Sequence, residues 1–210
     1  MRKLTSPDMK VGPHPYQEIH LSTAGLILGL CLSVLYGLMV WQPEQSRKIA
    51  VKLPRNSQVG TYLMGIGMVW FWLLVAPPDK GLFSSIAMDL GEFNKAKSIL
   101  MLAVPLFCVG MIVLVKEFLF VRGLGLCMLM AAAPLLYAAD FEKASFQFVM
   151  PLFCYIMIIK GLYFVGMPYL FRDGITWLTA TAGRWRAVSF AGLGVGLLFI
   201  ILSFTAWRGY

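Results

Sequence analysis

The chain has 210 residues, of which 59% are hydrophobic and only 13% carry a charge. An average soluble domain is about one-quarter charged and leaves roughly one-third of its chain surface in water, so this composition excludes a water-soluble domain. A transmembrane β-barrel would alternate polar and apolar residues along segments of about ten residues, whereas this sequence has long unbroken apolar runs. Because a chain in lipid must pair its own backbone groups, we expect an all-α, polytopic transmembrane helical bundle.

The net charge of +8 does not indicate a nucleic-acid partner. The Lys and Arg residues lie between the apolar runs, as is typical of juxtamembrane residues that face anionic headgroups. No basic tail or clustered basic stripe is present. We therefore expect the lipid bilayer and other membrane protein subunits, or further copies of this chain, as partners.

A polar N-terminal tail, residues 1–20, precedes a single transmembrane domain over residues 21–210. The first apolar run is long and lacks a small-residue cleavage site, so we interpret it as a retained helix and not as a signal peptide. A helix needs about 17–25 residues to cross a bilayer. The sequence contains six such runs: residues 21–41, 59–77, 99–115, 123–139, 147–169 and 187–207.

The third and fourth runs are short, and the segment between them holds Lys116, Glu117 and Arg122. A continuous helix would carry these charges through lipid, so we favour a helical hairpin; a five-helix bundle with one re-entrant segment is the alternative. The segment 77–98 has apolar residues at helical spacing, and 168–186 has aromatic residues suited to the headgroup layer. Both segments indicate helices that lie along the membrane surface.

The charge distribution favours an N-terminus outside the cell. With that orientation the inner loops hold nine basic residues and the outer segments hold eight, which hardly discriminates under the positive-inside rule. The segment 44–55 decides the prediction, because it holds four basic residues and the single acid Glu44. We expect a bacterial cytoplasmic (inner) membrane, since the chain shows no cleaved leader.

One short pattern occurs twice, as Pro-Leu-Phe-Cys-x-x-Met-Ile at residues 105–112 and 151–158. The two copies lie one helical hairpin apart and suggest an internal repeat of the kind found in transporters. Each copy also places a thiol and a thioether one helical turn apart. Such sulfur ligands suit Cu(I), but methionine and cysteine are also ordinary core residues, so we favour packing and expect no metal or cofactor. The candidate soft-metal ligands are Cys108, Met111, Cys154 and Met157.

Lys160 lies well inside the fifth run. A lysine at the centre of a span costs about 2.5–3.5 kcal/mol on insertion scales, which makes it a functional candidate. When the two copies of the repeat are aligned, Glu117 lies about three residues from the equivalent position, so we predict an intramembrane pair of Lys160 with Glu117. The alternative is that the Lys160 side chain extends to the headgroup layer.

Small residues mark the expected helix contacts. The first and last runs each contain Gly-x-x-x-Gly, a spacing that lets helix backbones approach closely in lipid. The residues are Gly25 and Gly29 in the first run, and Gly192 and Gly196 in the last. Proline should kink the third, fourth and fifth helices at Pro105, Pro134 and Pro151.

No catalytic motif is present. The two histidines, His14 and His20, lie in the tail, so the sequence contains neither a paired-histidine haem site nor a di-iron histidine box. Three functions remain: an accessory or scaffold subunit of a membrane complex, a small transporter or channel with a polar site around Lys160, and an enzyme that acts on lipid or quinone. The first is favoured because the chain has short loops and no soluble domain. The third depends on Arg122, Arg172 and Asp173.

Overall fold

The predicted all-α transmembrane bundle is confirmed. The computed structural model describes residues 15–75, 87–88, 90–114, 118–139 and 144–209. Six described helices are long and apolar enough to cross a membrane: α1 (Leu21–Trp41), α3 (Ser57–Val75), α4 (Lys97–Leu114), α5 (Leu119–Ala138), α6 (Val149–Gly166) and α8 (Ala182–Phe204). Shorter helical segments connect or flank them: η1 (Pro15–Glu18), α2 (Pro43–Lys52), η2 (Leu53–Arg55), η4 (Gly91–Ala96) and α7 (Pro168–Thr179).

Most helix boundaries differ from the predicted runs by a few residues, and three of the differences are informative. The helix α5 begins at Leu119, directly after Phe118, whose left-handed backbone (φ 57°) breaks the chain direction; Arg122 therefore lies in the first turn of α5. The helix α6 ends at Gly166, three residues before the predicted end of the fifth run. Pro168 then occupies the first turn of α7, where a missing N–H costs nothing, within the segment 168–186 for which a separate helix was predicted. The helix α8 begins before residue 187, at Ala182.

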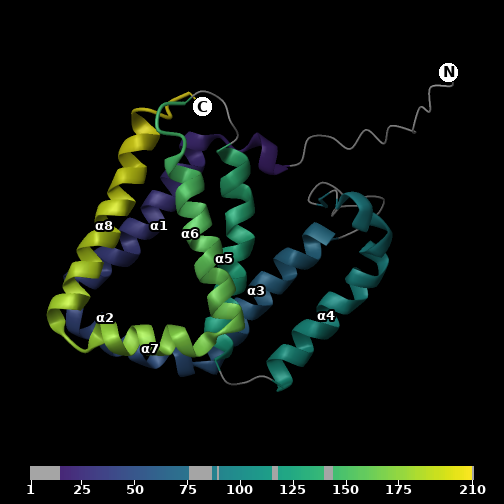
Figure 1. Cartoon of the computed structure of the whole chain (residues 1–210), viewed down its shortest axis with the longest axis horizontal. Helices are drawn as coiled ribbons and strands as arrows, with labels where there is room; N and C mark the ends of the chain where they lie inside the picture. Colours follow the sequence, from purple (N-terminus) through teal and green to yellow (C-terminus); the bar gives the residue numbers. More distant parts are fainter. Residues whose placement is uncertain (1–14, 76–86, 89, 115–117, 140–143, 210) are drawn as a thin grey trace.

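The spans form two units. The helices α1 and α8 pack along each other as a pair, while α5 lies between α3 and α6, and α4 packs on α3 (Figure 1). The units meet in one hydrophobic cluster near the C-terminus, where the rings of Phe153 in α6 and Phe199 in α8 lie 5.2 Å apart. The buried residues of this end cluster are Leu21, Ala24, Ala138, Ala139, Ala144, Met150, Cys154, Phe199, Leu202 and Trp207. At the opposite end, α2 and α7 run across between the units (Figure 1).

Glycine lets α1 and α8 approach closely. A methyl group on Gly29 would lie 2.9 Å from the backbone oxygen of Gly196, and one on Gly25 would lie 2.6 Å from the Ser203 Oγ. A methyl group on Gly192 would collide with the ring of Tyr36. The two Gly-x-x-x-Gly motifs thus lie in one interface and contact each other.

The contacts of α5 depend on glycines that the sequence analysis did not single out. A methyl group on Gly60 of α3 would lie 2.5 Å from the backbone nitrogen of Phe120, and one on Gly123 would lie 2.8 Å from that of Met64. On the other side of α5, a methyl group on Gly125 would lie 2.8 Å from the backbone oxygen of Gly161 in α6. Close backbone approach therefore holds α3, α5 and α6 together.

The segment η1 attaches the N-terminal end of the described chain to the four-helix unit, which consists of α3, α4, α5 and α6. The Tyr16 side chain is buried, its ring lies 6.2 Å from that of Tyr137 in α5, and the Trp70 indole N–H donates a hydrogen bond of 2.5 Å to its hydroxyl oxygen. Burial raises the pKa of the Tyr16 phenol, and the hydrogen bond from Trp70 opposes this increase.

This environment predicts a pH-dependent stability. The folded state holds the Tyr16 proton more tightly than the unfolded state. Above the unfolded-state pKa of about 10, loss of this proton therefore lowers the free energy of the unfolded state more than that of the folded state. Stability should therefore fall as the pH rises through that value, and Tyr16→Phe should reduce the fall between about pH 9 and pH 11. Thermal unfolding in detergent at several pH values measures the difference. Parallel profiles for the two proteins would contradict the prediction.

Candidate functional site

The predicted Lys160–Glu117 pair remains a prediction, because Glu117 lies outside the described residues. Lys160 is exposed on α6, six residues before Gly166, the last residue of that helix. At a rise of 1.5 Å per residue, its Cα lies about 9 Å from the helix end. A lysine side chain is long enough to span much of that distance, so its extension to the headgroup layer also stays a prediction.

The four candidate sulfur ligands are not gathered at one site. Cys154 is fully buried in the end cluster, with Met150 and Phe199. Cys108 and Met111 instead lie against a second cluster, around Met64 and Val104. Cys108 is the twelfth residue of α4 and Cys154 the sixth of α6, so the copies of the repeat occupy different positions along their helices. Among the described residues, no group of three or more His, Cys, Asp or Glu side chains could hold a metal ion.

The three polar residues considered for lipid or quinone chemistry also have different surroundings. Arg172 and Asp173 form an exposed ion pair of 2.9 Å within α7, and the Arg172 guanidinium lies 5.8 Å from the ring centre of Phe118. The Nε atom of Arg122 is buried without a hydrogen-bond partner in the described part of the chain.

Polar side chains are concentrated in the layer formed by α2 and α7. The helix α2 begins with Pro43 at its first position and Glu44 in its first turn, and ends with Lys52 in its last turn. An acid at the N-terminus and a base at the C-terminus both stabilise the helix dipole. The sequence therefore forms a helix of ten residues where the hydropathy pattern suggested a loop.

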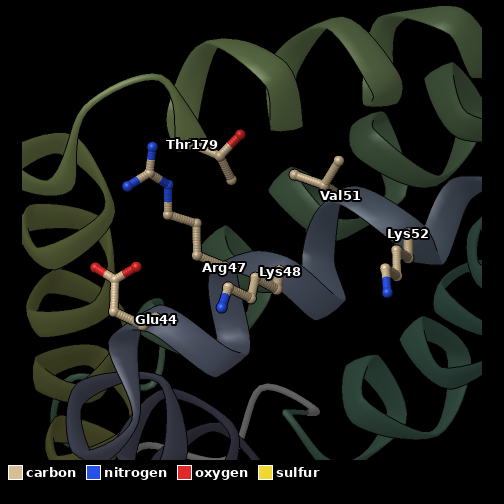
Figure 2. A pocket seen from close by; sticks show the side chains of 6 residues that line it. All are labelled: Glu44, Arg47, Lys48, Val51, Lys52 and Thr179. Carbon is tan, nitrogen blue, oxygen red and sulfur yellow. The ribbon is translucent and has the colours of Figure 1, made fainter.

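One face of α2 borders a pocket of about 530 Å³. The pocket is lined by five residues of α2 and by Thr179 at the end of α7, and Figure 2 shows the Arg47 side chain extending toward Thr179. The α2 residues follow the spacing i, i+3, i+4, i+7, i+8, which places them on one side of a helix. They are Glu44, Arg47, Lys48, Val51 and Lys52.

Hydrogen bonds fix the helices around the pocket. The buried Trp185 of α8 donates from its indole N–H to the Ser46 Oγ on α2, at 3.2 Å. The guanidinium of Arg184 lies 4.3 Å from the ring centre of Trp177 and donates a hydrogen bond of 3.3 Å to the Trp177 carbonyl oxygen near the end of α7. These contacts hold α2, α7 and the start of α8 in one layer.

The positive charge of the pocket is largely uncompensated. Three cationic side chains line the pocket with one carboxylate, Glu44. The one ion pair among the described residues is Arg172–Asp173, which does not line the pocket. Glu44, Lys48 and Lys52 are exposed, Arg47 is half-buried, and Thr179 at the end of α7 is buried. Such an arrangement attracts an anion.

Sequence reasoning used the basic residues of α2 to judge orientation and did not identify them as a site. The signal that marks them is the helical spacing of Glu44, Arg47, Lys48 and Lys52, together with the proline at position 43. No sequence pattern indicated that Thr179 lines the pocket, since its position there depends on how α7 lies against α2.

Comparisons with known proteins give no relative for this chain: no family model, no curated protein and no solved structure matches it.

Proposed function

We propose that this integral membrane protein is an accessory or scaffold subunit of a membrane protein complex in a bacterial cytoplasmic membrane. The observation that carries the proposal is the division of the bundle into the α1–α8 pair and the four-helix unit, which meet in the end cluster. A bundle divided in this way offers several separate helix faces to neighbouring membrane proteins.

The outer helix α4 is the face best suited to a partner. It packs on α3, and within α4 only Lys97 and Val104 are buried, while Leu102 and Leu106 are 77% and 72% exposed. Gly110 on the same helix has open space where a side chain would project. Glycine at an open position permits the close approach by which helices associate in lipid.

For orientation, we propose that the α2–α7 layer faces the cytoplasm, with the N-terminus outside. The basic residues of α2 support this orientation through the positive-inside rule. A cysteine-labelling experiment with a membrane-impermeant reagent would locate Gln45, which is exposed on α2. Labelling of Gln45→Cys in intact cells would contradict the proposed orientation.

The test of the proposed function is photo-crosslinking in cells. A photoreactive residue in place of Leu102 or Leu106 should give discrete adducts with other membrane proteins, and one in place of the buried Val104 should give none. Purification in mild detergent with mass spectrometry then identifies the partners. A protein that purifies alone or only with itself would contradict the subunit proposal, and a liposome flux assay of Lys160→Ala would then test transport.

A further inference from the structure

The pocket beside α2 lies at the end of the spans α1 and α3. The helix α2 follows the last residue of the span α1, at Trp41, and η2 leads directly into the span α3. Exposed apolar residues also mark the membrane surface here: Ile49 on α2 and Trp177 on α7 are 57% and 60% exposed. Helices with this composition lie in the interface between headgroups and acyl chains.

The cations of the pocket remain available to a ligand. The carbonyl end of α7 would otherwise attract them, because helix C-termini carry a partial negative charge. Arg184 already donates to the Trp177 carbonyl at that end. The one acid in the pocket lining, Glu44, lies in the first turn of α2, where it stabilises that helix.

The cations differ in kind, and together they suit phosphate. Arg47 presents a planar fork of donors that matches two oxygens of a phosphate, whereas Lys48 and Lys52 supply point charges. The volume of about 530 Å³ falls within the range of about 300–1,000 Å³ typical of small-molecule sites. Val51 adds an apolar wall, against which the glycerol part of an ester would lie.

We propose that the α2–α7 pocket binds an anionic phosphate ester. The proposal does not depend on the assignment as an accessory subunit. The phosphate ester is either the headgroup of an anionic phospholipid or a small soluble molecule, and both present the same group to Arg47, Lys48 and Lys52.

The test uses the full-length protein in neutral detergent, titrated with phosphatidylglycerol, with phosphatidylcholine and with glycerol phosphate. Saturable binding of phosphatidylglycerol that glycerol phosphate does not displace identifies a lipid site. Displacement by glycerol phosphate identifies a site for soluble phosphate esters. If phosphatidylcholine binds as tightly as phosphatidylglycerol, or if none of the three binds, the proposal is wrong.

Substitutions test whether the pocket is the binding site. A basic residue near a membrane surface changes binding roughly fivefold, so the double variant Arg47→Gln, Lys52→Gln should weaken binding by about 25-fold. Glu44→Gln should strengthen it about fivefold by the same reasoning. The matched control is Arg55→Gln, Arg186→Gln, which removes two exposed cations close in sequence to α2 and at the start of α8 but outside the pocket lining.

The control variant should change binding less than about twofold, because local contacts and not the total charge determine it. Equal losses in the pocket variant and the control would show non-specific attraction and overturn the proposal. Weaker binding in Glu44→Gln would also overturn it. The pocket variants should stay folded in the detergent used for binding, since the substituted side chains lie outside the buried core and stabilise α2 only through its helix dipole.

Discussion

Replacing Gly29 with alanine is expected to lower the free energy of unfolding by about 2–3 kcal/mol, because the added methyl group overpacks the α1–α8 interface. It would lie 2.8 Å from the Ile200 Cγ1 and 2.9 Å from the backbone atoms Gly196 O and Ile200 N. Backbone atoms cannot rotate away, so the two helices must separate. Titration with a denaturing detergent, followed by circular dichroism, measures the loss.

Gly37→Ala is the matched control on the same helix. A methyl group at Gly37 has nothing within 4 Å, and alanine favours a helix over glycine by about 0.8–1.0 kcal/mol. The control is therefore expected to be as stable as the unaltered protein or more stable. If the two substitutions had equal effects, the close contact of α1 with α8 would not be what stabilises the pair.

The second large effect is expected at Trp207, where Trp207→Ala should lower the free energy of unfolding by about 3–5 kcal/mol. The side chain is completely buried, and its ring lies 6.0 Å from that of Phe199. Its ring atoms also occupy the space that a methyl group on Gly25 would need. Truncation leaves a cavity in the end cluster, where the two helical units meet.

A second substitution separates the loss of volume from the loss of polarity. The Trp207 indole N–H is buried without a hydrogen-bond partner in the described part of the chain, so Trp207→Phe removes a group that stabilises nothing there. This variant should be far more stable than Trp207→Ala under the same detergent titration. Equal losses would show that the N–H, and not the packed ring, is important.

The apolar runs were sufficient to predict the class and the number of spans, because hydrophobic length is a local property of the sequence. The ends of the helices were less predictable. Arg122 lies inside α5 and Arg184 inside α8, since long basic side chains can extend from a helix end while their stems pack against apolar neighbours. A charged residue in the sequence therefore does not mark where a transmembrane helix begins or ends.

The partners of the helices were not predictable. The motifs at Gly25 and Gly192 were recognised separately, but no sequence pattern indicates that α1 packs on α8. The glycines that hold α5 were missed for a related reason: Gly123 and Gly125 lie two residues apart, and thus serve two different neighbours, α3 and α6. The Gly-x-x-x-Gly spacing describes glycines on one face of a helix, so it does not detect a helix whose glycines lie on two faces.

The candidate site was partly visible in the sequence. The basic residues of α2 were noticed for their charge, whereas their position on one helical face became apparent only with the helix itself. By contrast, Cys108 and Cys154 were linked by a repeated pattern that the fold does not bring together. Similar short patterns arise readily in apolar helices, which draw on few residue types.

The pairing of α1 with α8 also affects how the protein is made. The ribosome must add the residues from Gln42 to Phe204 before the last helix is complete, which takes roughly 8–30 s at about 5–20 residues per second. During that time the glycine face of α1 has no permanent neighbour in the membrane. The α1–α8 pair can therefore form only after α8 has been made, and a chain truncated before α8 would leave the glycine face of α1 open to other proteins.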